Sequence, residues 1–511
     1  MARRSGLQNL HDLVTALQFI PGLGRNRYPI VLVPGFSSFG EPLFGSINYW
    51  GGFEDLASAL QIYTGVPVIL PRIGPFSSNW ERACELYCQL DNIYNLGPVT
   101  GFDTPATSPP TPVGVDYGQY IPLPTPPPQH STKQAVLLGM LPGAWRWNSL
   151  NPVHMICHSQ GGNTVRLLIE LLSGNHGPRH PGYFGGHLGN RQNFVKSVVT
   201  LGTPYLGTTI TSVIFDHILR DVQVDEVISR LVVSASLNPN RFVDLQLDHW
   251  GFTPQPGETF LQMYNRLRVD IGNWWASDNN AVKDNGVAGI ARMNRDFAPT
   301  VSAATYYFTM SFDATRPLPR EYLSGEDLKS IPVHPLLSLG GLAYPGPFDW
   351  AAHGTSFLFG LGRDAASLIP GTPSDVAYAK WAAEVINHHL RVLGYRIRAP
   401  SPGGRIPRDD MLPVLSIFSI GMSGISTSLG LSEQNDGVVD TSSMRGPASE
   451  PIQDIVGFNR ASIPGNRGVY WDLGLTEGID HADEVGVFTV PATYMLVLRM
   501  YRRLGDLLSF L

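Results

Sequence analysis

The sequence predicts an α/β fold built on a mostly parallel sheet with helices on both faces. Five short apolar runs are typical of strands that are buried on both faces. They occupy residues 29–35, 66–70, 153–157, 195–201 and 305–312. Helical patterns lie between several of these runs, as at residues 50–63 and 80–90, and strands that alternate with helices favour a parallel sheet. An amphipathic pattern at residues 492–511 predicts a last helix that docks on this sheet, the alternative being a membrane contact.

The composition is that of a globular protein with a large core. The chain has 511 residues, 43% hydrophobic and 15% charged, and a net charge of −6. It contains no block of basic residues, so we do not expect a nucleic-acid partner. Three cysteines, Cys84, Cys88 and Cys157, are too few for a disulfide framework. No apolar run is long enough for a transmembrane helix, and the sequence says nothing of the oligomeric state.

We expect one elaborated domain over residues 1–511, with three segments added to its core. These are a Pro-rich insertion at residues 104–130, an amphipathic stretch at residues 212–237 and a long insertion at residues 324–405. The N-terminal stretch is not a secretory signal, because polar residues such as Asp12 interrupt its apolar positions. The sequence therefore assigns no compartment, and the cytoplasm is the default expectation.

The most informative motif is a serine at a predicted strand-to-helix turn. The strand at residues 153–157 runs directly into His158, Ser159, Gln160 and Gly161, and a helical pattern follows. This is the context of the nucleophile elbow of the α/β-hydrolase fold, whose motif is G-x-S-x-G. Cys157 replaces the first glycine, at a position that needs a small side chain. Ser159 is therefore the candidate nucleophile, and we expect its neighbour His158 to point away from it and pack in the interior.

A serine hydroxyl needs a base that removes its proton and an acid that orients the base. In α/β-hydrolases the order along the chain is serine, acid, histidine. Asp436, in the turn Asn435-Asp436-Gly437, and His481, in a late polar loop, satisfy that order. Each also has a plainer interpretation, as an Asx-turn residue and as a surface histidine. Asp440 is the reserve acid.

An oxyanion also needs hydrogen-bond donors, which in this fold are usually two backbone N–H groups. Gln160 follows the nucleophile and supplies the first. Phe36 follows the first predicted strand and supplies the second. Its plainer interpretation is an aromatic residue that lines the pocket, and it can be both because only its backbone donates.

Several blocks along nearly the whole chain resemble, in order, the thermoalkaliphilic zinc-containing lipases of bacteria and their fungal relatives. The blocks are P-I-V-L-V-P-G-F, S-S-N-W-E-R-A-C-E-L-Y, H-S-Q-G-G-N-T-V-R-L-L, L-G-T-P-Y-L-G-T-T, L-D-H-W-G-F-T-P-Q-P-G-E, T-Y-Y-F-T-M-S-F and N-D-G-V-V-D-T-S-S-M-R-G-P. The resemblance implies a catalytic triad and an oxyanion hole. The residues are Ser159 as nucleophile, Asp436 as acid, His481 as base, and Phe36 and Gln160 as oxyanion donors. The family usually has Ala at the position of Cys157, so the cysteine is one small residue in place of another.

The same resemblance implies metal sites whose ligands are incomplete here. The family's zinc is held by two Asp and two His, of which Asp248 and His130 are present while Glu81 replaces the second Asp. Closed zinc sites need four ligands. Asp483 matches an acidic calcium ligand, but Phe488 stands where another Asp is expected. The proposed chemistry requires no cofactor.

The resulting expectation is a serine lipase that hydrolyses acylglycerols at an oil–water interface, with residues 212–237 forming a lid helix region. The alternatives are a carboxylesterase or phospholipase that uses the same triad, and a lipid-binding protein with an inactive site. Members of the resembled family are secreted, which leaves the compartment of this chain open.

Overall fold

The computed structural model describes residues 5–36, 48–91, 135–143, 145–174, 190–220, 255–277, 280–317, 404–408 and 410–511, with a few single positions between 223 and 252. The Pro-rich insertion at residues 104–130 lies outside the described residues. So does the insertion at residues 324–405, apart from its last two residues, and most of the stretch at 221–237.

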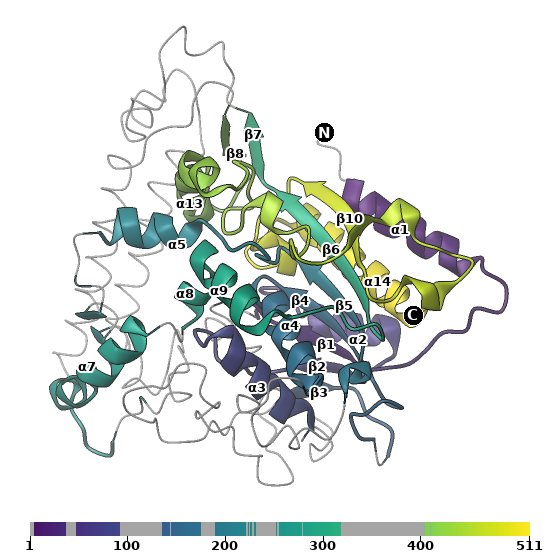
Figure 1. Cartoon of the computed structure of the whole chain (residues 1–511), viewed down its shortest axis with the longest axis horizontal. Helices are drawn as coiled ribbons and strands as arrows, with labels where there is room; N and C mark the ends of the chain where they lie inside the picture. The colour runs from purple at the N-terminus through teal and green to yellow at the C-terminus, as the bar shows by residue number, and fades with distance from the viewer. Residues whose placement is uncertain are drawn as a thin grey trace, which may run out of the picture.

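An eight-stranded, mostly parallel sheet forms the centre of the molecule, as predicted (Figure 1). Its strand order is β3-β2-β1-β4-β5-β6-β10-β9, and in this sheet only the described pair β2–β3 is antiparallel. The strands are β1 (Ile30–Val33), β2 (Val68–Leu70), β3 (Val136–Leu138), β4 (Val153–His158), β5 (Val195–Leu201), β6 (Tyr306–Asp313), β9 (Ile452–Asp454) and β10 (Tyr470–Glu477). A separate antiparallel pair joins β7 (Thr315–Pro317) to β8 (Arg405–Pro407).

The central strands are continuously apolar because their alternate side chains enter two different cores. Met155 of β4 lies in the core that α3 and α4 cover, whereas Ile156 lies in the core that α1, α2 and α14 cover. Val31 and Leu32 of β1 divide in the same way. The helices are α1 (Ser5–Gln18), α2 (Leu56–Thr64), α3 (Asn79–Asp91), α4 (Gln160–Leu172), α7 (Phe260–Ala276), α8 (Ala281–Asn285), α9 (Val287–Phe297), α13 (Pro413–Ile425) and α14 (Pro491–Ser509). Helices on both faces therefore confirm the predicted layers.

The predicted helix at residues 50–63 starts later than expected. Gly51 and Gly52 have φ values of 114° and 67°, which a helix does not allow. Asp55 then caps α2, because its carboxylate accepts a hydrogen bond from the Ser58 N–H at 2.8 Å. The helix therefore begins at Leu56.

The C-terminal helix docks as predicted. Val497, Tyr501 and Leu504 of α14 are fully buried in the core that α1 and α2 share. Within the described part of the chain, no helix is long and apolar enough to cross a membrane.

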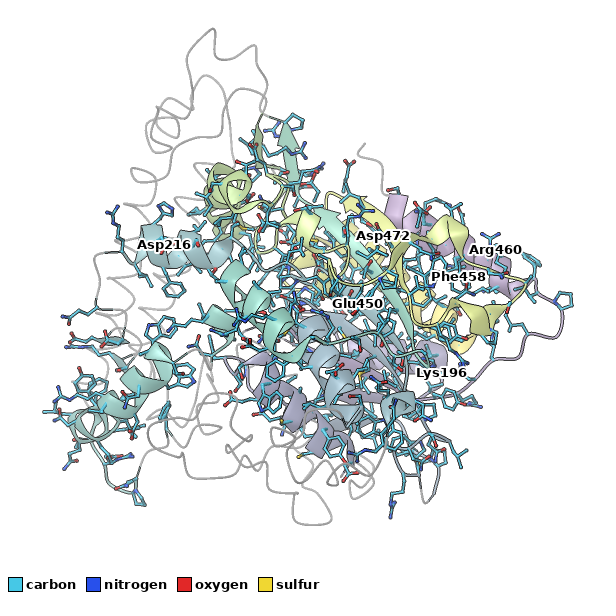
Figure 2. The ribbon with its side chains drawn as sticks, viewed as in Figure 1. Lys196, Asp216, Glu450, Phe458, Arg460 and Asp472 are labelled. Carbon is cyan, nitrogen blue, oxygen red and sulfur yellow. The ribbon has the colours of Figure 1, made fainter. Side chains whose placement is uncertain are left out.

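The segment that follows β9 packs on one face of the sheet, over β10 and β6. Phe458 packs on Trp471 at 5.3 Å between ring centroids and on Phe308 at 6.0 Å, whereas Arg460 is exposed (Figure 2). This packing fixes β10, which leads directly into the loop that carries His481.

Candidate active site

Ser159 lies in the tight turn between β4 and α4, with φ 53° and ψ −129°. Such a backbone is strained for a residue with a side chain. The turn is tight because the helix approaches the sheet closely. A Cβ on Gly161 would lie 2.5 Å from the Val33 carbonyl oxygen, and one on Gly162 would lie 2.3 Å from Thr203 Oγ1. Gly161 and Gly162 are therefore required, because a side chain at either position would overlap these atoms.

Cys157 occupies a packing position next to this turn. It is fully buried and pairs with Val33 of β1 and Thr200 of β5. Burial raises the pKa of its thiol well above the usual value, so the group stays neutral. The cysteine therefore contributes volume to the core.

Asp436 and His481 form a buried acid–imidazole pair. His481 Nδ1 is 2.7 Å from Asp436 Oδ2, and the His481 backbone N–H donates to the Asp436 carbonyl at 3.0 Å. The other carboxylate oxygen, Oδ1, accepts the N–H groups of Val438 and Val439 at 2.8 and 2.7 Å. Asp436 therefore has both of the roles considered from the sequence: it forms an Asx-turn and it pairs with His481.

The surroundings of His481 favour its charged form. Burial alone would lower the pKa of the imidazole, but the carboxylate of Asp436 and then that of Glu484 raise it to about 10. A base in this setting is stabilised at the moment when it has taken a proton.

Asp440, the reserve acid, has a different role in the structure. It accepts hydrogen bonds from the Thr209 N–H at 2.9 Å and from the hydroxyls of Thr209 and Ser426. Burial raises its pKa to about 6. Asp440 therefore ties the segment after β5 to α13 and makes no hydrogen bond with His481.

His158 is buried, as expected for a packing residue, but its contacts are polar. Its Nδ1 lies 2.5 Å from the hydroxyl of Tyr49, and its Nε2 lies 3.2 Å from a carboxylate oxygen of Glu484. Its ring centroid is 4.4 Å from that of His481. Glu484 belongs to no motif and was not among the predicted site residues. The only signal in the sequence is its position three residues after His481, a spacing of about one helical turn.

Ser159 follows His158, whose ring contacts that of His481, directly along the chain. Ser159 also lines one cavity together with Val438 and Val439 of the Asp436 loop. Among the described residues, the Ser159 hydroxyl makes no hydrogen bond. Nucleophile–base contacts are often looser in proteins without substrate.

The loop after β1 carries Phe36 and is held from two sides. The Gly35 N–H donates to the Tyr49 hydroxyl at 2.9 Å. Arg82 of α3, which is fully buried, donates to the carbonyls of Pro34 and Gly74 and to a threonine hydroxyl of α4. Gln160, the other predicted oxyanion donor, is the first residue of α4, and its N–H has no acceptor within the helix.

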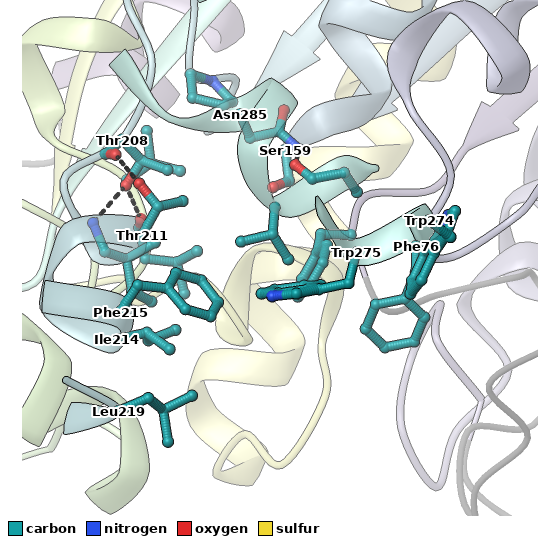
Figure 3. A pocket seen from close by; sticks show the side chains of 17 residues that line it. Phe76, Ser159, Thr208, Thr211, Ile214, Phe215, Leu219, Trp274, Trp275 and Asn285 are labelled. Carbon is teal, nitrogen blue, oxygen red and sulfur yellow. Dashed lines mark hydrogen bonds between the residues drawn. The ribbon is translucent and has the colours of Figure 1, made fainter. Parts of the chain in front are cut away.

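An apolar cavity of about 330 Å³ opens beside Ser159 (Figure 3). Phe215 and Trp275 lie 5.1 Å apart between ring centroids in its wall, and Phe36 and Phe76 are also 5.1 Å apart. The other apolar lining residues include Ile210, Ile214, Leu219, Trp274, Val282, Val438 and Val439. The stretch predicted as a lid thus contributes Ile214, Phe215 and Leu219, from π-helix η5 (Val213–Ile218) and the residue after it.

The predicted metal ligands are not brought together in the part of the chain that the structure describes. Glu81 caps its own helix, since its carboxylate accepts the Ser78 N–H at 3.2 Å. His130 and Asp248 lie outside the described residues. Asp483 accepts the Asp480 N–H at 3.4 Å, and Phe488 is exposed.

A different set of ligand-type side chains, His158, His481 and Glu484, gathers within 4.8 Å. Two of its four imidazole nitrogens are already engaged, by Tyr49 and Asp436. The donor set therefore fits an acid–base cluster better than a resident metal.

Comparison with known proteins gives the same class of fold. The structure of Staphylococcus hyicus lipase matches with a TM-score of 0.60 and 20% identity, covering 96% of this chain and 97% of that one. Lipase 1 of Pelosinus fermentans matches with a TM-score of 0.51 and 25% identity, over 95% and 99% of the two chains. The molecule therefore has the α/β-hydrolase fold, as predicted.

At the level of sequence, a family model described as "Lipase-like, C-terminal domain" matches residues 139–322. The lipase of Staphylococcus epidermidis is 29% identical over 302 residues, which are 55% of this chain and 38% of that protein. The chain thus aligns with less than half the length of this curated relative. The chain is therefore similar to bacterial lipases, in agreement with the predicted resemblance, but the comparisons do not single out the zinc-containing branch.

Proposed function

We propose that this chain is a serine lipase that hydrolyses the ester bonds of acylglycerols through an acyl-enzyme. The observation that carries the proposal is the pairing of His481 with Asp436 at 2.7 Å, together with an apolar cavity that is lined by Ser159 and by Val438 and Val439 of the Asp436 loop. The similarity to bacterial lipases supports it.

In the first half of the reaction, Ser159 Oγ attacks the ester carbonyl carbon while His481 Nε2 takes the hydroxyl proton. Asp436 keeps the Nδ1–H of the imidazole directed toward itself, so that Nε2 is the nitrogen free to accept. The N–H groups of Phe36 and Gln160 donate to the oxyanion of the tetrahedral intermediate. Collapse expels the alcohol, which receives the proton from His481, and the acyl group stays on Ser159.

In the second half, a water molecule gives its proton to His481 and attacks the acyl carbon. The second tetrahedral intermediate breaks the ester bond to Ser159, releases the fatty acid and returns the proton to the serine oxygen. The balance of the two halves is one ester and one water consumed, and one alcohol and one acid formed. No metal takes part in these steps. Treatment with a chelator should therefore leave the rate unchanged if the protein holds no structural zinc or calcium, and a loss that added zinc or calcium restores would reveal a structural metal site.

The cavity wall fits an acyl chain, because most of its lining side chains are apolar. We propose that residues 212–237 form a lid whose apolar side faces this cavity in water. Opening at a lipid surface would exchange that contact for lipid, as for other amphipathic helices.

Two measurements test this function. Ser159→Ala should lower the rate of ester hydrolysis by about 10⁵- to 10⁶-fold, whereas Ser311→Ala should leave it unchanged. Ser311 is a matched control because it is buried and its hydroxyl is unpartnered among the described residues. Substantial activity in Ser159→Ala would refute the assignment.

The second measurement is the rate against substrate concentration through the solubility limit. A lipase with a lid gains activity when an interface forms. A hyperbolic curve that saturates below this limit would instead indicate a carboxylesterase for soluble esters, and a preference for phosphatidylcholine vesicles would indicate a phospholipase.

A further inference from the structure

Glu484 is a buried carboxyl behind the base, and the reaction described above makes no use of it. It lies in the short 3-10 helix η13 (Asp483–Val485), and none of its side chain is exposed. Among the described residues, neither of its carboxyl oxygens accepts a well-oriented hydrogen bond. Burying a carboxyl that has no well-oriented donor is costly, so the position of Glu484 beside His481 calls for an explanation.

The carboxyl of Glu484 lies between two imidazoles. Its Oε2 is 3.2 Å from His158 Nε2, and its Oε1 is 3.7 Å from His481 Nδ1. A carboxylate and the imidazolium of His481 at such a separation interact strongly where water is excluded. Glu484 is therefore a second carboxyl, after Asp436, that faces the same nitrogen of the base.

His158 connects this carboxyl to the loop that carries Phe36. The Gly35 N–H donates to the Tyr49 hydroxyl, whose own proton is then available to His158 Nδ1 at 2.5 Å. Burial lowers the pKa of His158 well below its usual value, so the ring is neutral. With Nδ1 accepting, its single proton is on Nε2 and faces Glu484.

The recess around Glu484 is shaped for a carboxyl. A Cβ on Gly202, which follows β5 with φ 56°, would lie 2.3 Å from Glu484 Oε2. The Tyr501 hydroxyl of α14 donates to the backbone carbonyl of Glu484 at 3.2 Å and fixes the turn from the other side.

We propose that Glu484 is a positioning residue for the reaction. Its carboxyl orients His481 and stabilises the imidazolium. Through His158 and Tyr49, Glu484 also connects the base to the loop that carries Phe36. This inference rests on the proposed serine-hydrolase function. No bond to substrate is made by Glu484 itself.

The charge of Glu484 should be visible in the pH profile. The groups that face His481 are Asp436 from its turn, Glu484 from η13 and His158 from the end of β4. Tyr49 and Tyr501 also face Glu484. Burial raises the pKa of Glu484 itself well above the ordinary value, and the neighbouring His481 lowers it again. In its ionised form Glu484 raises the pKa of His481, so replacing it with a neutral residue lowers that pKa. Since the base must be neutral to accept a proton, the acid limb of kcat/KM then moves to lower pH.

The experiment compares Glu484→Gln and Glu484→Leu with the wild type. We expect Glu484→Gln to keep kcat within about threefold and to move the acid limb down by about one pH unit. Glu484→Leu, which removes both polar atoms, should lower kcat by at least tenfold and leave KM unchanged. A purely structural role would not move the pH profile or separate kcat from KM.

The matched control is Glu170→Gln. Glu170 is a buried glutamate of α4 that accepts the Thr300 N–H at 3.1 Å, so its variant also loses a buried carboxyl but should keep the wild-type profile. An acid limb of kcat/KM that stays at its wild-type pH in Glu484→Gln would overturn the inference. If Glu484→Leu does not fold, the pH profile of Glu484→Gln is a sufficient test of the inference. Failure of the proposed function would show differently, as activity retained in Ser159→Ala.

Discussion

Replacing Asp436 with asparagine should nearly abolish hydrolysis while leaving the fold intact. The side-chain oxygen Oδ1 accepts two backbone N–H groups, from Val438 and Val439, at 2.8 and 2.7 Å. In the variant the amide oxygen must keep this place, because an NH₂ group there would face two donors. The NH₂ group is then directed at His481 Nδ1.

This orientation forces the wrong tautomer on the base. A donor opposite Nδ1 makes that nitrogen the acceptor, so the proton moves to Nε2, the atom that must accept the serine proton. Loss of the correct tautomer in a comparable triad costs about 10⁴ in kcat, which corresponds to about 5 kcal/mol of activation free energy. We therefore expect Asp436→Asn to lose about three to four orders of magnitude in kcat.

The assay is the initial rate on a short-chain p-nitrophenyl ester from about pH 5 to about pH 10, with thermal unfolding to verify the fold. Asp472→Asn is the control, because Asp472 of β10 pairs with Arg445 at 2.9 Å and makes no hydrogen bond with His481. More than a tenth of wild-type kcat in Asp436→Asn, with the large loss in Asp440→Asn instead, would refute the reasoning and assign the acid to the reserve position.

Two further predictions concern the walls of the site. Arg82→Met removes the buried donor to the Pro34 carbonyl and leaves several acceptors unpaired. We expect it to lower the free energy of unfolding by about 3–5 kcal/mol, measured by urea titration, and a loss below about 1 kcal/mol would show that the tether is dispensable. Trp275→Ala enlarges the cavity beside Ser159 and should shift the preference toward longer acyl chains, measured as kcat/KM over a series of esters. An unaltered chain-length profile would mean that the acyl chain lies elsewhere.

The part of the fold that could be predicted from the sequence is the part with a continuous apolar pattern. Strands β1, β4, β5 and β6 are buried on both faces, so their residues are apolar throughout and stand out. Strand β10 was not predicted, because polar residues such as Asp472 and Glu477 and an irregularity near Gly474 interrupt its pattern. Strand β9 has only three residues, of which two are exposed, which leaves no periodicity to detect.

In the candidate site, too, the residue with a local sequence pattern could be predicted more directly than the residues that only the fold brings together. Ser159 is marked by a local motif, since its turn, strand and helix are adjacent in the sequence. Asp436 and His481 could be placed only by chain order, and each is compatible with an ordinary loop residue until the fold brings them within 2.7 Å. Glu484 carries no motif, and its relation to His158 depends on two segments that are more than three hundred residues apart in the chain.

Covalent labelling tests the central claim most directly. A fluorophosphonate reacts with a serine only when a base activates it, so incubation of the protein with this probe followed by peptide mapping identifies the nucleophile. The account predicts a single adduct on Ser159, formed far more slowly in Asp436→Asn. An adduct on another serine, or ester hydrolysis that persists when Ser159 is fully labelled, would contradict it.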